Sequence, residues 1–118
     1  MLLNLSNHPS SSWPEKQIQE ANRLFGDIRD MPFPHIDPEA SEEDIQRLSE
    51  VYKEDILAMR PQAVHIMGEL TFCFQLVFKL RQVGIPCLAS TTHRTTEDLP
   101  NGTKISKFEF VRFRKYDL

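Results

Sequence analysis

Apolar and polar positions along this chain repeat with two different periods, and each period predicts a different kind of element. Short apolar runs bounded by turn-forming residues predict strands, whereas apolar residues at every third or fourth position predict amphipathic helices. The expected strands span residues 2–5, 28–31, 63–67 and 85–89. The expected helices span residues 14–25, 42–60 and 70–83. Strands that alternate with helices in this way are typical of a doubly wound parallel sheet.

Turn and cap residues support the same division. Ser41 is expected to cap the second helix, which ends before Pro61, and Gly26 is expected to end the first. The turn signal Pro100-Asn101-Gly102 precedes a β-rich run, so we expect a C-terminal hairpin whose last strand spans residues 108–113. With right-handed crossovers the strand order is 2-1-3-4. The prediction is therefore one α/β domain, residues 1–118, with a Rossmann-like, mostly parallel sheet, flanking helices and a C-terminal hairpin.

The helix over residues 70–83 is apolar almost all round its circumference. Such a helix either lies deep in the domain or forms a subunit interface. Together with the aromatic final strand, this pattern predicts a homodimer.

Charge and composition exclude several classes of protein. The chain has 14 Lys and Arg against 17 Asp and Glu, which gives a net charge of −3, so a general binder of long nucleic acids is not expected. The longest apolar run, near residues 70–80, is too short to cross a bilayer, and no signal peptide is evident, so we expect a cytoplasmic protein without a membrane partner. Cys73 and Cys87 stand in apolar surroundings and are expected to be buried, reduced thiols.

Polar residues follow three strands that are expected to be neighbours. In open α/β sheets, ligands bind outside the carboxyl ends of the strands. These ends carry residues 6–8, 68–71 and 90–94, and the Gly68 turn leads into a helix whose N-terminus favours an anion. The side chains and backbone expected to bind phosphate or ribose belong to Ser6, Asn7, Gly68, Glu69, Thr71, Ser90, Thr91 and Thr92.

Two further residues are candidates for catalysis, and both have a structural alternative. His8 suits proton transfer near neutral pH, although it precedes a proline and also fits a surface loop. Arg94 suits bidentate contact with phosphate, although it also fits a solvated surface position. Ser6, Asn7 and Thr71 equally fit caps of the local backbone. His65 lies within an apolar strand and is interpreted as a satisfied core or interface histidine.

Several motifs are missing. There is no GxGxxG, no GxxxxGK[ST], no GxSxG and no zinc-ligand spacing, so neither a cofactor nor a metal site is predicted.

The segments Asn4–Pro9, Gly68–Thr71 and Ser90–Arg94, each placed after a strand, resemble those of small stand-alone Rossmann-like proteins of type III CRISPR systems. That group includes CARF-type cyclic oligoadenylate sensors and minimal ring nucleases. Because the chain has no second, effector domain, the resemblance favours the degrading members.

The resemblance implies a homodimer that binds cyclic tetra-adenylate across its two-fold axis and switches off antiviral signalling. Such ring nucleases cleave without metal: a ribose 2′-hydroxyl attacks the adjacent phosphate and leaves a 2′,3′-cyclic phosphate. By position, His8 would transfer a proton and Arg94 would offset the developing charge. Two alternatives stay open, a non-catalytic cyclic-nucleotide sensor and an adaptor domain without a ligand.

Overall fold

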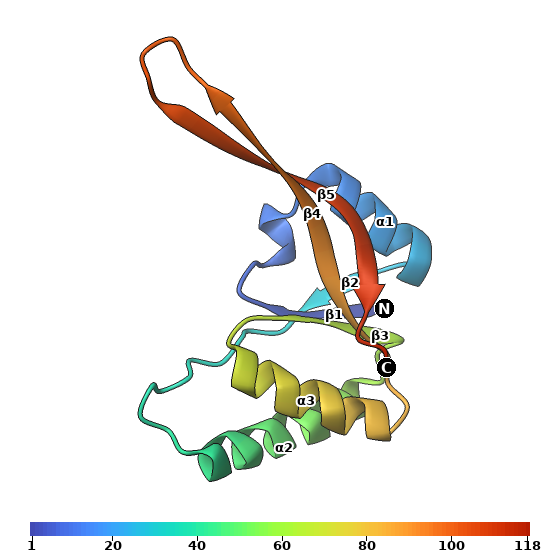
Figure 1. Ribbon diagram of the computed structural model, residues 1–118. Helices are drawn as coiled ribbons and strands as arrows, with labels where there is room; N and C mark the ends of the chain where they lie inside the picture. The colour runs from blue at the N-terminus through green and yellow to red at the C-terminus, as the bar shows by residue number, and fades with distance from the viewer.

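A single sheet divides the molecule, with α1 on one face and the packed pair α2 and α3 on the other (Figure 1). The computed structural model describes residues 1–118. Its elements are β1 (Leu2–Ser6), the short 3-10 turn η1 (Ser10–Ser12), α1 (Glu15–Phe25), β2 (Ile28–Asp30), α2 (Glu42–Met59), β3 (Ala63–Met67), α3 (Leu70–Gln82), β4 (Cys87–Asp98) and β5 (Lys104–Lys115).

The strands form one sheet in the order β2-β1-β3-β4-β5. The first four are parallel to their neighbours, and β5 pairs antiparallel with β4. The expected α/β class, the order 2-1-3-4 and the C-terminal hairpin are therefore confirmed. The carboxyl ends of the parallel strands point the same way, which brings the loops after β1, β2 and β3 to one edge of the sheet.

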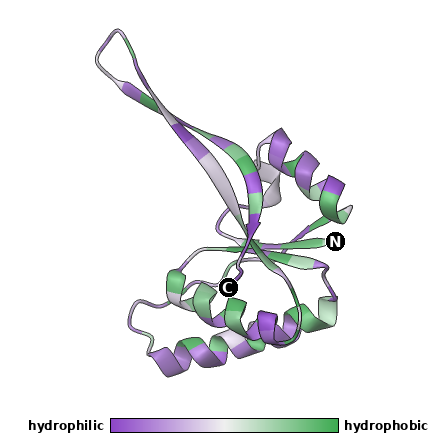
Figure 2. Ribbon diagram, turned by 45° about the vertical axis from the view of Figure 1, so that its right-hand side comes forward, coloured by the Kyte–Doolittle hydropathy of each residue, from purple (hydrophilic) through white to green (hydrophobic).

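Alternate residues of the central strands supply two separate apolar clusters. Leu3, Leu5 and Val64 belong to the cluster beneath α2 and α3, whereas Leu2 and Ala63 belong to the one beneath α1. Strands buried on both faces read as continuous apolar runs, which explains the green sheet centre in Figure 2.

The helix ends match their sequence signals. Ser41 accepts from the backbone N–H of Asp44, and the Asp44 side chain accepts from the backbone N–H of Ser41, so both halves of a capping box are present. Gly26 ends α1 with a φ of 82°, a conformation that glycine adopts without strain.

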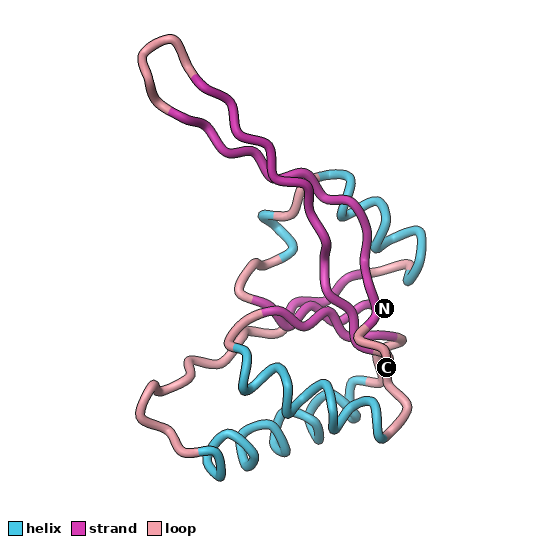
Figure 3. The backbone as a smooth tube through the Cα atoms, viewed as in Figure 1, coloured by secondary structure: helices cyan, strands magenta, loops and turns pink.

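The fourth strand is longer than expected. The prediction that it ends at residue 89 is wrong, because β4 continues to Asp98 and pairs with β5 along its whole length (Figure 3). A register shift between Thr91 and Thr92 marks the point beyond which the ribbon leaves the body. We call residues 92–110 the arm. Pairing with β5 satisfies the backbone there, so the arm needs no apolar core of its own. Phe110, at its base, is the one arm residue in the apolar cluster beneath α1.

Helix α3 is buried on one side only. Phe72, Leu76 and Leu80 lie in the core, while the side chains of Leu70 and Phe74 are 81% and 70% exposed. The alternative in which this helix lies deep in the domain is therefore wrong.

Both cysteines are free and buried, as expected. Burial raises the pKa of the Cys73 thiol to about 11 and that of Cys87 to about 12, so both stay protonated at neutral pH. No helix of the structure has the length and apolar character needed to cross a membrane.

Candidate functional site

Six polar residues form a connected cluster on the α1 side of the sheet. We call Asn4, Ser6, Gln17, Asp30, His65 and Ser90 the polar cluster. Four of them, all but Asp30 and Ser90, are buried. Burying a polar group is unfavourable unless it is hydrogen-bonded, and here no buried side-chain nitrogen or oxygen lacks a partner.

Asn4 is the centre of the cluster. Its Nδ2 donates to Asp30 Oδ1 at 2.9 Å and to the His8 carbonyl at 2.9 Å. Its Oδ1 lies 2.8 Å from Ser6 Oγ and 2.9 Å from Nδ1 of His65. The amide thereby links β1 to β2, to β3 and to the loop that follows β1.

His65 carries the network from β3 to β4. Its Nε2 lies 2.5 Å from Ser90 Oγ, and Gln17 Nε2 of α1 donates to the same oxygen at 3.0 Å. Trp13 and Phe113 pack edge-on to the imidazole, with ring centroids 5.1 and 5.7 Å away. Burial, together with the charge of His8, lowers the pKa of His65 to about 4, so the ring is neutral at physiological pH.

Asp30 is the anionic end of the cluster. It accepts from the Ser10 backbone N–H at 3.0 Å and from Ser10 Oγ at 2.7 Å. Burial raises the pKa of Asp30, but the hydrogen bonds from Asn4 and Ser10 lower it by more, so the group stays ionised at neutral pH.

The three candidates after β1 separate into one buried and two exposed side chains. Ser6 is 7% exposed, and its Oγ accepts from the backbone N–H of His8 at 3.2 Å. It therefore caps the local backbone, which is the structural alternative that the sequence left open. Asn7 and His8 are exposed at the rim. The His8 carbonyl accepts from Asn4, Ser6 and Trp13, so its backbone is held firmly.

The residues after β3 serve the start of α3. The Glu69 carboxylate accepts from the backbone N–H groups of Thr71 and Phe72 and from the Thr71 hydroxyl. These bonds, that from Phe72 above all, lower the pKa of Glu69. The open anion site expected at this helix N-terminus is therefore filled by the chain's own carboxylate. Gly68 is required for a different reason, because a Cβ there would lie within 2.9 Å of three atoms of the Phe33 ring.

Of residues 90–94, only Ser90 reaches the polar cluster. Thr91 Oγ1 donates to the Arg112 carbonyl, and Thr92 is the first residue of the arm. Arg94 lies about 13 Å beyond Ser90 along the extended strand. Its guanidinium contacts Ser106 Oγ at 3.4 Å and stacks over the Phe108 ring at 5.7 Å. The loop expected to carry Arg94 into the site is a strand that carries it away.

Sequence reasoning missed His65, Gln17 and Asp30 as members of the site. One signal was present: Asn4 and Ser6 are polar residues two apart in an otherwise apolar strand, and His65 interrupts the next apolar strand in the same way. Residues two apart share a face of the sheet, so such interruptions indicate a polar spot on one face of a buried sheet.

No group of three or more His, Cys, Asp or Glu side chains is arranged to hold a metal ion. The main apolar groove, about 680 Å³, lies along α3 and the C-terminal tail, on the opposite face from the polar cluster.

Comparison with known proteins assigns a family. The family model described as "Uncharacterized protein MJ1673 family" matches residues 1–114. No curated protein matches the chain.

Proposed function

Because the chain belongs to the uncharacterized protein MJ1673 family, its activity must be inferred from its site, and we propose that it is a metal-independent ring nuclease acting in the cytoplasm. The proposed substrate is a cyclic oligoadenylate, cyclic tetra-adenylate first, whose cleavage switches off type III CRISPR signalling.

One observation carries the proposal. A hydrogen-bonded set of side chains from β1, β3 and β4 ends at Ser90, a partly exposed residue at the edge where parallel sheets bind ligands. Asn7 and His8 lie exposed at the end of β1. This arrangement suits a reaction in which the substrate supplies its own nucleophile and the protein positions it.

In the proposed reaction, a ribose 2′-oxygen bonds to the adjacent phosphorus, and the bond to the 5′-oxygen breaks. The products are linear and end in a 2′,3′-cyclic phosphate. The rim residues Asn7, His8 and Ser90 would contact the ligand. Arg94 has no place in this scheme, since it lies on the arm.

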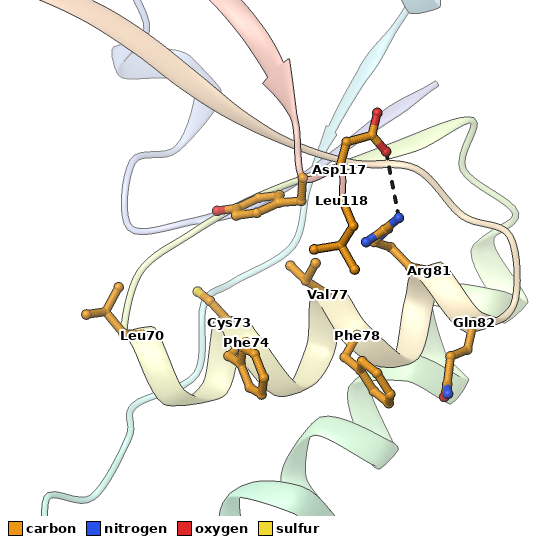
Figure 4. A pocket seen from close by; sticks show the side chains of 10 residues that line it. Leu70, Cys73, Phe74, Val77, Phe78, Arg81, Gln82, Asp117 and Leu118 are labelled. Carbon is orange, nitrogen blue, oxygen red and sulfur yellow. Dashed lines mark ion pairs between the residues drawn. The ribbon is translucent and has the colours of Figure 1, made fainter.

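We also propose that the working form is a homodimer joined through α3. The exposed side chains of Leu70, Phe74 and Phe78 follow one another at four-residue spacing, and we call them the α3 ridge. Figure 4 shows Phe74 and Phe78 beside the groove that Val77 and Leu118 also line. An apolar ridge of this kind on a small protein is typical of an interaction surface.

A second copy fits the α3 ridge in its charge as well as its apolar character. If two α3 helices cross antiparallel about a two-fold axis, Glu69 at the start of one lies near Arg81 at the end of the other. Opposite charges and opposed helix dipoles then meet at both ends of the contact.

The test is to incubate the purified chain with cyclic tetra-adenylate in excess EDTA and to resolve the products. We expect linear fragments with 2′,3′-cyclic phosphate ends. A ring that stays intact while calorimetry shows binding would replace the proposal by a nucleotide sensor. An intact ring with no binding would leave an adaptor that acts through the α3 ridge.

The matched control is a pair of serine substitutions. Ser90→Ala removes the hydroxyl at the edge of the polar cluster, whereas Ser106→Ala removes an exposed hydroxyl on the arm. Loss of cleavage in the first variant alone is the expected result. Equal rates in both would place the reaction elsewhere on the molecule.

A further inference from the structure

The hydrogen bonds that lead from Asp30 to Ser90 admit only one assignment of donors and acceptors. Asn4 donates through Nδ2 to the Asp30 carboxylate and to the His8 carbonyl, neither of which can donate in return. Its Oδ1 must therefore face His65, which requires the hydrogen on Nδ1 of that ring. Because the ring is neutral, its Nε2 carries a lone pair.

This assignment determines the direction of the Ser90 hydroxyl. An unprotonated Nε2 can only accept, so the Ser90 hydrogen points to His65 at 2.5 Å. The same Oγ accepts from Gln17 through one lone pair, and its second lone pair has no partner within the protein. A carboxylate, an amide and an imidazole thus stand in series behind one hydroxyl group, as in nucleophile–base pairs whose base is oriented by a third group.

The backbone N–H of Ser90 has an unusually weak partner. It donates to the thioether sulfur of Met67 at 3.3 Å, and thioether sulfur is a poor acceptor. Met67 lies at the end of β3 and is 37% exposed. A phosphoryl oxygen that displaced this sulfur would gain a stronger hydrogen bond from the same amide.

We propose that Ser90 is the substrate-contacting group of this site and that His65, held by Asn4, accepts a proton through it. This assignment rests on the proposed ring nuclease activity. It gives the proton-transfer role that was expected of His8 to His65 instead. His8 contributes its carbonyl to the network, and its ring is at the surface.

The ribose 2′-hydroxyl gives its proton to Ser90 Oγ while the Ser90 hydrogen moves to Nε2 of His65. The 2′-oxygen bonds to phosphorus, and the bond from phosphorus to the 5′-oxygen breaks. The proton then returns from His65 through Ser90 to the 5′-oxygen, and the Ser90 N–H donates to a phosphoryl oxygen throughout.

The groups around His65 support this direction of transfer. Trp13 and Phe113 pack against the buried His65 ring, and Gln17 and Ser6 are uncharged. His8 is the charged group that acts on the ring directly, whereas the Asp30 carboxylate is joined to it only through the Asn4 amide. Because burial disfavours the charged form, an imidazolium formed during the reaction would pass its proton back readily.

The first experiment does not depend on ring cleavage. A fluorophosphonate probe reacts with a hydroxyl that a base has polarised: the Ser90 oxygen bonds to phosphorus, fluoride leaves, and the proton goes to His65. We expect mass spectrometry to find the adduct on Ser90 and not on Ser106. His65→Gln should slow the labelling at least about 100-fold. An unlabelled wild-type chain, or equal labelling in His65→Gln, would overturn the assignment.

The second experiment measures cleavage of cyclic tetra-adenylate by Ser90→Ala, His65→Gln and the double variant. We expect each single variant to lose about 100-fold in rate and the double variant to lose no more, because the two groups act as a unit. Ser106→Ala, which alters only the arm, should stay within a few-fold of wild type. Losses that multiply in the double variant, or a matching loss in Ser106→Ala, would contradict the relay.

The two experiments separate the relay from the activity on which it rests. If Ser90 is labelled in a His65-dependent manner while the ring stays intact, the ring nuclease proposal fails and the polarised serine stands. If the ring is cleaved while Ser90→Ala keeps the wild-type rate, the activity stands and the relay fails. Circular dichroism of each variant confirms that rates are compared between folded chains.

Discussion

The side-chain oxygen of Asn4 lies 2.9 Å from Nδ1 of His65, although 61 residues separate the two in the chain. The contact follows from the register of the sheet, because Asn4 of β1 and His65 of β3 are paired directly across neighbouring parallel strands. Both side chains lie on the α1 face, so a polar pair sits in the middle of an apolar sheet. The behaviour of this pair leads to the first two predictions.

Acid should weaken the fold through His65. Above about pH 6.5 the imidazole is neutral in both the folded and the unfolded chain. As the pH falls below that, the unfolded chain binds a proton, whereas the folded chain does so only near its pKa of about 4. The free energy of unfolding should therefore fall by about 3 kcal/mol between pH 6.5 and pH 4. Urea unfolding across this range measures the loss, and His65→Gln should lack that part of it.

Removing the centre of the network should cost more than removing its neighbour. Asn4→Ala leaves the His65 Nδ1–H without its acceptor inside the protein and deprives Asp30 of a donor. We expect a loss of about 2–4 kcal/mol in the free energy of unfolding. Asn7→Ala changes an exposed asparagine three residues away and should lie within about 0.5 kcal/mol of wild type. Similar losses in the two variants would contradict the role given to Asn4.

A methyl group at Gly68 should conflict with the Phe33 ring. The closest ring atom would lie 2.3 Å from the added Cβ, so the ring must move away from its edge-on contact with Phe72. We expect Gly68→Ala to cost about 1–3 kcal/mol. The same change in a Phe33→Ala background should cost much less, and a double-mutant cycle of thermal unfolding measures the difference. Additive effects would show that the ring is not the obstacle.

Loss of the Glu69 carboxylate should weaken the start of α3. Glu69→Ala removes the acceptor for the backbone N–H groups of Thr71 and Phe72, at a cost of about 1 kcal/mol. Because hydrogen bonding lowers the pKa of Glu69, the cap contributes at neutral pH and is lost as the pH falls through that pKa. Glu43→Ala, which removes an exposed carboxylate in the first turn of α2, is the comparison. Equal costs for the two variants, or no cost, would contradict the cap.

Charges on the α3 ridge should separate the proposed dimer. Phe74→Glu and Phe78→Glu each place a carboxylate where two copies are proposed to pack, and light scattering should then report a monomer. Phe108→Glu alters an equally exposed aromatic residue on the arm and should leave the dimer intact. A wild-type chain that is monomeric at micromolar concentration would remove the dimer from the proposal.

Most of the fold was predictable because each element carries its own local signal. Ser41 caps α2, Gly26 ends α1, and apolar runs mark the parallel strands. The length of β4 was not predictable in this way. Beyond Thr91 the strand has no buried face, so no alternation of apolar and polar residues reveals it. The strand forms there because it pairs with β5, and no local pattern within β4 reveals that pairing.

The position of the polar cluster was predictable only in part. The carboxyl ends of β1 and β3 do lie at one edge, and Ser90, within β4, belongs to the polar cluster beside them. Arg94 was placed at that edge only because β4 was expected to end before it. His65 was interpreted as a core residue, which it is by burial, yet a hydrogen bond connects it to Ser90, a partly exposed residue. Burial alone therefore does not distinguish a core histidine from a histidine that belongs to a functional site.

The arm stands apart from the body in one further respect. Both of its strands continue into the sheet. Its tip is a turn over residues 99–103, in which the Leu99 N–H donates to the Thr103 carbonyl and the Gly102 N–H donates to the Leu99 carbonyl. Substitutions at the tip therefore do not change the packing of either apolar cluster. Insertions or deletions there should accumulate during evolution without disturbing the body, so related chains are free to differ most in the length of this ribbon.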